Sequence, residues 1–505
     1  MPEPRNVADF LLEGKEEDRV ALSLLKADHT YGDLRRATGQ VVRYLTKGNS
    51  RPGDRVLIAA DNSLLWVAAY LGSMAAGRVA APLPASISAP ELASVRAITE
   101  ARIAFVQAAA LARNEAGFAG MDVITERRAQ PAPSIASQCA LPDLEAADQE
   151  WPDTIGAGHD LAALMFTSGS TGQPRGVMIS HANLIANTES IIDYLRLTKD
   201  DRIMAVLPFY YCFGASLLHT HLRAGGSLVV DSRFLYPETV LERMIETGCT
   251  GFAGVPSHFQ ILLRSSSIRK KRFPRLRYVQ QAGGCLPKAF LAELRQALPA
   301  TRIFVMYGQT EATARLSYLP PELLDKKLGS IGKGIPGVRL RVLDESGAEV
   351  RAGEVGEIVA EGANIARGYW RAPEESAATF RDGRLHTGDL ATVDEDGFLY
   401  IVDRAKDFLK CRGERVSCRQ LEERMLECED LLEAAVVGMP DDVLGEAVRA
   451  FVVGRAKNGD GLAGKVLAFC REHLPPHLLP KEIVTLSALP KNSAGKVLKA
   501  GLRNM

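Results

Sequence analysis

The sequence predicts an α/β protein with a large N-terminal domain of parallel αβ sheets, a β-rich subdomain and a small α+β C-terminal domain. Three patterns predict it. Apolar strand-like runs alternate with helical periods from about residue 30, short strands separated by turn residues begin near Ser330, and mixed patterns return after Arg404. The 505 residues leave room for about three to five structural units of roughly 100–200 residues each.

The elements follow in order along the chain. Buried strands are expected at 54–60, 79–83, 102–107, 202–208, 227–231, 277–284 and 302–308, and helices at 63–77, 216–226, 238–248 and 288–298. Strand–helix–strand units of this length imply parallel strands joined by right-handed crossovers. Segment 119–157 has few large apolar residues and is expected to be a surface connection between lobes. The domain boundary is placed at 403–406, which gives domains 1–403 and 404–505.

Composition excludes several classes of protein. Hydrophobic residues are 46% and charged residues 24%, as in ordinary globular chains. Lys+Arg and Asp+Glu are 61 each, so no bulk charge points to nucleic acid or an anionic membrane. The eight cysteines form no C-x-x-C pair, the N-terminus lacks a secretory apolar region, and Arg78 interrupts the most apolar stretch. A cytoplasmic protein without a membrane span is expected.

The most informative stretch is LMFTSGSTGQPRGVMI, residues 164–179. Its glycines allow the backbone to approach an anion closely, and N–H groups with flanking hydroxyls can surround phosphate oxygens. It is not a Walker loop, because no Gly-Lys-Ser/Thr opens a helix. A bare Ser/Gly run is more often a flexible surface loop, but the buried strands on both sides favour a phosphate cradle. Its candidate residues are Thr167, Ser168, Gly169, Ser170, Thr171, Gly172 and Arg175.

The string TSGSTGQPRGV resembles the phosphate-binding motif of the acyl-adenylate-forming (AMP-binding) superfamily, which includes acyl- and aryl-CoA synthetases, peptide-synthetase adenylation domains and beetle luciferases. Further strings resemble that superfamily's motifs in the expected order, at 30–34, 72–83, 307–312, 353–370, 386–417 and 490–499. Together they extend over nearly the whole chain.

The resemblance implies a reaction in two halves. A carboxylate attacks the α-phosphate of ATP, giving acyl-AMP and pyrophosphate, and a thiol then displaces AMP to form a thioester. Residues 167–172 would hold the β- and γ-phosphates. Arg175 stands where the family usually has lysine, and its planar guanidinium is expected to alter how pyrophosphate is handled.

The resemblance also assigns the nucleotide contacts. Thr310 would contact the α-phosphate and Glu311 would bind Mg²⁺, a cation that suits one carboxylate plus phosphate oxygens. A lone Thr-Glu is also an ordinary helix start, and both roles are compatible. The remaining expected contacts are Tyr307 and Gly308 at adenine, Gly283 and Gly284 as a pocket wall, Asp389 at the ribose, and Arg404 at ribose or phosphate.

A domain rotation is implied as well. By resemblance, Lys496 would stabilise the adenylation transition state, and the C-terminal domain would then rotate about Lys406 to admit the thiol. The segment 410–417 would next face the adenylate. There, Lys410, Arg412 and Arg415 could attract CoA phosphates, and Gly413 is a further candidate cofactor contact, although a merely solvated charged strand is an equally good interpretation.

The residues that would bind the acid substrate give weaker sequence signals. Amino-acid adenylators of the family carry a Phe-Asp-x-Ser string, and here Phe213 is followed by Gly214, so a substrate ammonium would lack its counter-charge. Tyr211 occupies a position where many acyl-CoA synthetases have histidine and is expected to gate the pocket. Phe252 and Gly254 resemble the pocket floor, with ordinary core packing as the alternative.

The function predicted from these observations is an ATP-dependent acyl-CoA ligase for an apolar fatty, aryl or polycyclic acid that is not an α-amino acid. One alternative loads an acyl carrier protein through its phosphopantetheine thiol. Another performs only thioesterification from a ready-made acyl-adenylate, as Arg175 and Tyr211 suggest. A non-enzymatic nucleotide-binding module is disfavoured, because the phosphate loop, Glu311, Asp389 and Lys496 are all present.

Overall fold

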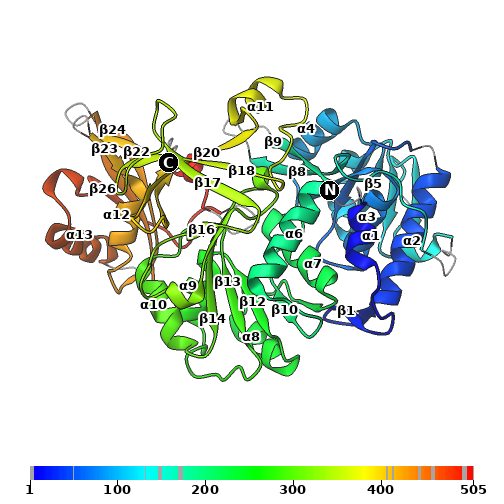
Figure 1. The fold of residues 1–505 in the computed structure, drawn as a ribbon, viewed down its shortest axis with the longest axis horizontal. Coiled ribbons are helices and arrows are strands. Elements are labelled where there is room, and N and C mark those ends of the chain that lie inside the picture. The colour runs from blue at the N-terminus through cyan, green and yellow to red at the C-terminus, as the bar shows by residue number, and fades with distance from the viewer. Residues whose placement is uncertain are drawn as a thin grey trace.

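The structure is a computed structural model. It describes residues 5–48, 50–130, 132–145, 151–168, 174–404, 408–411, 414–441, 445–455, 461–491, 497–503 and 505. Four sheets organise these residues, two large ones in the N-terminal part, an antiparallel one after them and a fourth at the C-terminal end (Figure 1). This is the α/β architecture that the sequence predicts.

The sheet that carries most of the site has the order β16-β15-β14-β13-β12-β10-β11-β1-β2 among the described residues. Its strands from β1 to β14 along this path run parallel, whereas β2, β15 and β16 are antiparallel edges. The bounds are β1 Val20–Ser23, β2 Asp28–Thr30, β10 Arg202–Ala205, β11 Ser227–Val230, β12 Gly251–Gly254, β13 Tyr278–Gln281, β14 Arg302–Tyr307, β15 Ser317–Leu319 and β16 Lys333–Gly334.

The second large sheet has the order β7-β6-β5-β3-β4-β8-β9. It is parallel except for β9, which pairs antiparallel with β8 in a register that sets Ser168 opposite Pro174. The two strands that flank the Ser/Gly-rich segment in the sequence therefore pair with each other. The bounds are β3 Arg55–Ala59, β4 Val79–Leu83, β5 Ile103–Val106, β6 Asp122–Thr125, β7 Ser137–Ala140, β8 Leu161–Ser168 and β9 Pro174–Ser180.

Segment 119–157 corrects one expectation. The sequence predicts only a surface connection, but β6 and β7 extend the second sheet within it. Val123 and Ile124 are buried, and this short apolar run pairs parallel with β5. Two or three apolar residues suffice for a short strand once neighbouring strands supply the hydrogen bonds, and no local pattern indicates those neighbours.

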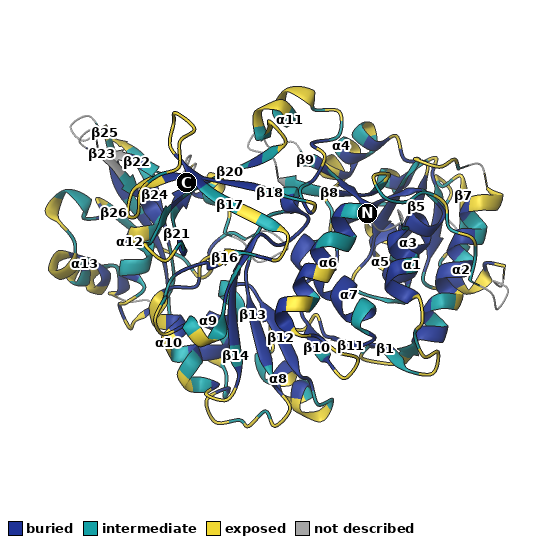
Figure 2. Cartoon of the chain, viewed as in Figure 1, coloured by how far each residue is buried: buried dark blue, intermediate teal, exposed yellow. Residues whose placement is uncertain are grey.

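Helices cover the sheets and meet between them (Figure 2). Helix α3 (Leu64–Ala75) is buried on nearly every side, as its uniformly apolar sequence requires, and it packs against α2 (Tyr31–Lys47) and α1 (Val7–Leu12). Thr30 and Asp33 form a capping box that begins α2. The other N-terminal helices are α4 Ala89–Thr99, α5 Ala108–Arg113, α6 His181–Leu195, α7 Cys212–Ala224, α8 Pro237–Glu246, α9 Pro256–Ser265 and α10 Lys288–Ala297.

The predicted β-rich subdomain is an antiparallel sheet built from β17 Val338–Leu343, β18 Val355–Gly362, β19 Phe380–Arg381, β20 Arg384–Val393 and β21 Leu399–Arg404, with α11 (Pro373–Thr379) before β19. The last sheet contains β22 Phe408–Cys411, β23 Glu414–Ser417, β24 Leu431–Asp441, β25 Gly445–Gly454 and β26 Glu482–Thr485, with helices α12 Cys418–Met425, α13 Leu462–His473 and α14 Lys499–Arg503. Short 3₁₀ turns complete the chain at Glu115–Phe118, Leu141–Asp143, Thr310–Ala312, Pro321–Leu323 and Pro476–Leu478.

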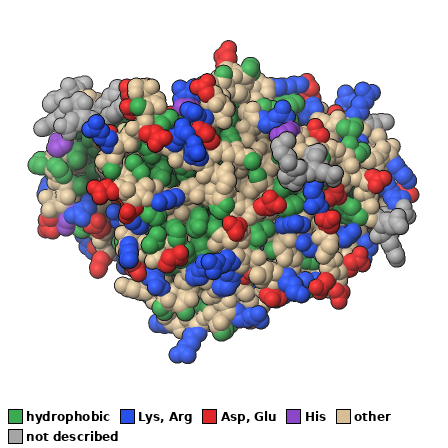
Figure 3. Space-filling model, viewed as in Figure 1, with side chains coloured by type: hydrophobic (Ala, Val, Ile, Leu, Met, Phe, Trp, Pro, Cys, Tyr) green, Lys and Arg blue, Asp and Glu red, His purple; other side chains and the backbone are tan. Residues whose placement is uncertain are grey.

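The surface carries Lys and Arg interspersed with Asp and Glu over the face seen in Figure 3, as the equal numbers of the two charges predict. Within the described residues, no helix combines the length and the apolar character that crossing a membrane requires.

Buried histidines make the fold sensitive to acid. His181, His219 and His221 are buried, and burial lowers their pKa values to about 4, 3 and 4 respectively. Above pH 6.5 these side chains are neutral in both the folded and the unfolded chain. As the pH falls from 6.5 towards 4, the unfolded chain binds protons that the folded chain does not, and stability is lost.

We therefore expect the free energy of unfolding to fall over this range by up to about 1.4 kcal/mol per pH unit for each such histidine. Denaturant titrations between pH 4.5 and 7.5 measure the slope. His219→Gln keeps a partner for the Tyr70 hydroxyl, which is 3.2 Å from His219 Nε2. This variant should reduce the slope by the contribution of one proton, about 1.4 kcal/mol per pH unit. An unchanged slope would show that His219 is not neutral in the fold.

Candidate active site

The candidate residues gather at the carboxyl ends of parallel strands. Tyr211 lies in the connection after β10, Gly254 ends β12, Gly283 follows β13, and Tyr307 ends β14, with Thr310 just beyond it. In open parallel sheets these ends form the edge at which ligands bind. The topology thus brings together residues that are about 100 positions apart in the chain.

Tyr307, Asp389 and Arg404 form one hydrogen-bonded group. The Tyr307 hydroxyl donates to Asp389 Oδ2 over 2.6 Å, and Arg404 Nε donates to Asp389 Oδ1 over 3.1 Å. Asp389 and Arg404 stand directly opposite each other on β20 and β21. Burial, and then the neighbouring Asp389 carboxylate, raises the pKa of Tyr307 well above its usual value. The predicted ribose-binding carboxylate is therefore buried and held by a phenol and a guanidinium.

Thr310 and Glu311 lie on the 3₁₀ turn that follows β14. The Thr310 hydroxyl donates to Cys212 Sγ over 3.4 Å, which ties this turn to the start of α7. The Tyr369 hydroxyl donates to Glu311 Oε1 over 2.9 Å, and the Arg175 guanidinium lies over the Tyr369 ring at 5.6 Å from its centroid. The Arg175 guanidinium therefore stacks on Tyr369, the residue whose hydroxyl is hydrogen-bonded to Glu311.

These residues fit a magnesium ion that is held jointly with phosphate. The described residues contain no group of three or more His, Cys, Asp or Glu side chains able to hold a metal on their own. Glu311 offers an oxygen beside the one that Tyr369 occupies, and a hard cation takes one carboxylate together with phosphate and water oxygens. The donor set thus suits Mg²⁺ that arrives with a nucleotide.

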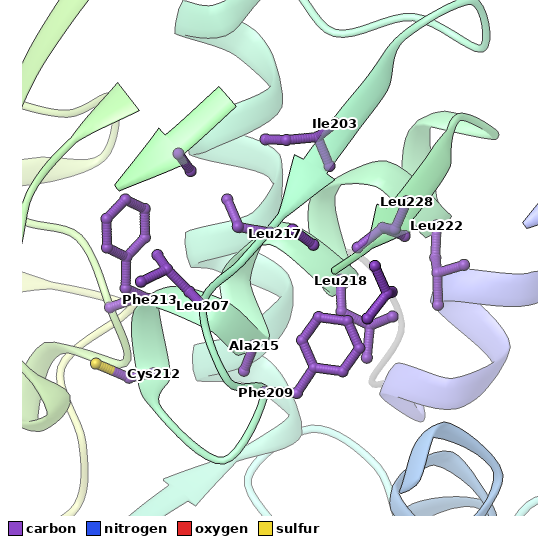
Figure 4. Packing of buried hydrophobic residues seen from close by; sticks show 14 of the residues in the cluster. Ile203, Leu207, Phe209, Cys212, Phe213, Ala215, Leu217, Leu218, Leu222 and Leu228 are labelled. Carbon is purple, nitrogen blue, oxygen red and sulfur yellow. The ribbon is translucent and has the colours of Figure 1, made fainter. Parts of the chain in front are cut away.

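The start of α7 carries residues that the sequence predicts to contact the acid, the predicted acid side of the site, and Figure 4 shows Cys212 and Phe213 there among buried hydrophobic side chains. This helix begins at Cys212, four residues earlier than the sequence pattern predicts, so that Phe213 and Gly214 lie in its first turn. Gly283 has φ +82°, and a Cβ built there would lie 2.9 Å from Val255 Cγ1 and 3.2 Å from the Tyr211 hydroxyl. Tyr211 is thus placed against the predicted nucleotide wall.

Gly214 admits no side chain. A Cβ at this position would lie 2.0 Å from the Pro208 carbonyl oxygen and 3.1 Å from that of Leu207. An aspartate here, as in amino-acid adenylators, would require the 207–208 backbone to move. The position therefore cannot supply a counter-charge for an ammonium group.

The pocket-floor residues are tightly packed. A Cβ at Gly254 would lie 3.1 Å from His258 Cβ and 3.2 Å from both Phe252 and Phe259, and the Phe252 ring packs edge-on against Phe259 at 5.7 Å. The surroundings of Gly254 are therefore filled by these side chains, as the core-packing alternative would have them. Contact of Phe252 and Gly254 with the acid stays a prediction.

Part of the predicted site lies outside the described residues: Gly169, Ser170, Thr171, Gly172, Lys406, Arg412, Gly413 and Lys496, together with the side chains of Ser168, Lys410 and Arg415. Their roles stay predictions. Among the described residues, sequence reasoning missed Tyr369 and Cys212. Tyr369 could have been found, because it lies within the motif at 353–370.

Two family models match the chain: one described as "AMP-binding enzyme" over residues 12–370 and one described as "AMP-binding enzyme C-terminal domain" over residues 420–496. The chain belongs to the AMP-binding enzyme family. It is an AMP-forming acid–CoA ligase of the acyl- and aryl-CoA ligase type, with ATP and CoA as substrates.

Individual relatives agree with this assignment. Feruloyl-CoA synthase of Amycolatopsis sp. is 32% identical over 94% of this chain and 93% of that protein. The 2-succinylbenzoate–CoA ligase of Bacillus cereus is 29% identical over 97% of this chain and 96% of that protein. The crystal structure of ATP-bound MatB from Rhodopseudomonas palustris superposes with a TM-score of 0.86 and 28% identity, covering 99% of this chain and 98% of that one.

Gly214→Ala tests the close approach at the start of α7. Because even a methyl group would contact the 207–208 carbonyls, we expect this substitution to destabilise the ligase by roughly 1–3 kcal/mol. Gly464→Ala in α13 is the matched control, since open space surrounds that helical glycine and alanine should be neutral or stabilising. Thermal unfolding compares the two. Equal melting temperatures for Gly214→Ala and the native protein would show that the contact relaxes without cost.

Proposed function

We propose that this ligase activates a carboxylic acid with a largely apolar fatty, aryl or polycyclic body and no α-ammonium group, and transfers the acyl group to CoA. The observation that carries the proposal is the close packing at Gly214, which removes the counter-charge position for an amino acid. The apolar surroundings support it, because Phe213 and Phe252 are both buried there. The names of two relatives, feruloyl-CoA synthase and 2-succinylbenzoate–CoA ligase, refer to acids with an aryl body, which is consistent with these apolar surroundings.

In the first half-reaction, the chain's own groups would orient the nucleotide and neutralise charge. The Asp389 carboxylate would accept a hydrogen bond from a ribose hydroxyl, while Tyr307 and Arg404 hold that carboxylate in place. Thr310 would donate to the α-phosphate, and Arg175 together with the loop at 167–172 would bind the β- and γ-phosphates. Magnesium, when bound at Glu311, would supply positive charge to the phosphate oxygens.

In the second half-reaction, the C-terminal domain would change orientation about Lys406. In the described orientation, Arg419 on α12 donates to Cys285 Sγ over 2.6 Å and to the Ile401 carbonyl over 2.9 Å. Cys285 directly follows the predicted pocket wall at Gly283 and Gly284. A rotation would break the Arg419–Cys285 contact, so these residues belong to the surface that exchanges partners between the two halves.

A carboxylic-acid screen tests the proposal. Pyrophosphate release is measured with ATP and each acid, with and without CoA, and thioester is measured with CoA or with a carrier protein bearing phosphopantetheine. We expect release with a neutral-bodied acid, no release with α-amino acids, and thioester formation with CoA. Robust release with an α-amino acid would refute the substrate class. Thioester formed only from synthetic acyl-AMP would favour the transfer-only alternative, and thioester only on the carrier protein would favour loading.

A further inference from the structure

Arg315 is a buried cation beside the acid side of the site. It lies between the 3₁₀ turn of Thr310 and β15, and its side chain is 1% exposed. Its carbonyl accepts hydrogen bonds from Asn187 on α6 over 3.1 Å and from Asn364 over 2.9 Å. The backbone is thus fixed from two directions, and the side chain extends into the interior between α6 and α7.

The guanidinium is only partly satisfied: the Tyr194 hydroxyl is hydrogen-bonded to it, but two of its nitrogens have no partner among the described residues. Its carbon lies 4.5 Å from the centroid of the Phe213 ring. Within the described parts of the chain, Nε and Nη2 have no hydrogen-bond partner and no carboxylate forms an ion pair with Arg315. Burying a charge is costly unless it is paired and hydrogen-bonded, and arginine is rarely buried without a partner.

Two other arginines show the usual solution. Arg78 is 3% exposed and donates to the carbonyls of Leu45 and Ser50. Arg277, whose side chain is 33% exposed, pairs with the buried carboxylate of Asp201 at 2.8 Å. Arg315 differs because its stacking on Phe213 orients the guanidinium fork without satisfying it.

The residues around Arg315 favour the acid, rather than the nucleotide, as the ligand of its guanidinium. Phe213 is two residues from Tyr211, and the Cys212 thiol, whose pKa burial raises, is within electrostatic reach of the Arg315 charge. The expected ribose contact, Asp389, already pairs with Arg404. The Tyr194 hydroxyl on α6, whose pKa is raised by burial, is hydrogen-bonded to the guanidinium and leaves Nε and Nη2 without a partner in the described part of the chain.

We propose that Arg315 determines specificity by binding a second carboxylate on the tail of the acid substrate, so that this ligase prefers dicarboxylic acids with an apolar body. The proposal deepens the proposed function and rests on it. A guanidinium fork matches a carboxylate through two parallel hydrogen bonds. Nε and Nη2 are the edge of the fork that such a bidentate pair uses. The apolar body would lie along Phe213, and Tyr211 would move aside to admit the tail.

The first test uses the native enzyme and acids that differ only at the far end. On the scaffold that the acid screen finds most active, the tail carries carboxylate, carboxamide or methyl; on benzoate these are terephthalic, 4-carbamoylbenzoic and 4-methylbenzoic acid. We expect kcat/KM to decrease in that order, with carboxylate preferred over methyl by roughly 100-fold or more. Activation of acids without this order, or with methyl preferred, overturns the role of Arg315. No activation of any acid would instead refute the proposed function.

The second test assigns the preference to Arg315. Arg315→Met should abolish or reverse the carboxylate-to-methyl ratio, and Arg315→Lys, which keeps the charge but loses the fork, should retain part of it. Arg78→Met is the matched control, because it removes a buried arginine whose partners are backbone carbonyls and should leave the ratio unchanged. An equal loss with all three acids in Arg315→Met would assign Arg315 to the phosphate or to structure. If Arg315→Met does not fold, the ratio in Arg315→Lys decides, and a native ratio there overturns the proposal.

Discussion

Glu311→Gln is expected to lower the rate of adenylation by about 10²–10³-fold, because the site loses the carboxylate charge that would bind a cation shared with the phosphates. The substitution preserves shape, and the amide oxygen can still accept the hydrogen bond of the Tyr369 hydroxyl, which is 2.9 Å from Glu311 Oε1. The fold should therefore be retained. Acid-dependent exchange of pyrophosphate into ATP, measured over a range of Mg²⁺ concentrations, gives the rate.

Tyr369→Phe is the matched control for this prediction. It removes the hydroxyl that orients Glu311 but keeps both the carboxylate and the ring beneath Arg175. We expect a smaller loss, of roughly 10-fold, with a higher Mg²⁺ concentration at half-maximal rate. If Glu311→Gln shows the native rate and Mg²⁺ dependence, Glu311 does not bind the metal. If the two variants are equally slow, the hydroxyl rather than the charge carries the effect.

Lys496→Ala is expected to reduce adenylation by orders of magnitude while leaving thioesterification from synthetic acyl-AMP largely intact. The reason is charge: the lysine would stabilise the developing negative charge between carboxylate and α-phosphate, and that charge is absent from the second half-reaction. Pyrophosphate exchange measures the first half, and thioester formation from acyl-AMP and CoA measures the second.

Lys491→Ala controls for the loss of a nearby charge. Lys491 pairs with Glu433 at 2.6 Å, so its removal should perturb the C-terminal domain without touching the reacting groups. We expect both half-reactions to stay within about threefold of the native rates, since a partly exposed ion pair contributes little. An equal decrease of both half-reactions in Lys496→Ala would contradict the alternation of the C-terminal domain and make the lysine structural.

Much of this protein could be determined from the sequence alone, because local patterns report local structure. The apolar runs at 54–60 and 79–83 correspond to β3 and β4, since a strand buried on both faces needs a continuous apolar segment. The antiparallel subdomain after Ser330 follows from short strands punctuated by turn residues. The ordered motifs predicted the family, which the matches over 12–370 and 420–496 confirm. The last two strands at one end of the second sheet, β6 and β7, were missed, because a neighbouring strand rather than their own composition makes them strands.

Only the tertiary structure decided which motif residues meet and which side chains support them. Asp389 and Arg404 are brought opposite each other by the β20–β21 register, and Glu311 meets Tyr369 across 58 positions of sequence. From the sequence, Gly214 indicates only that the aspartate of amino-acid adenylators is missing. The structure adds that a Cβ at this position would lie 2.0 Å from the Pro208 carbonyl oxygen. In the sequence, nothing distinguishes Arg315 from the other arginines. The role proposed for it rests on burial with two guanidinium nitrogens unsatisfied by the described residues, and burial results from packing between α6, α7 and the sheet, which no local sequence pattern encodes.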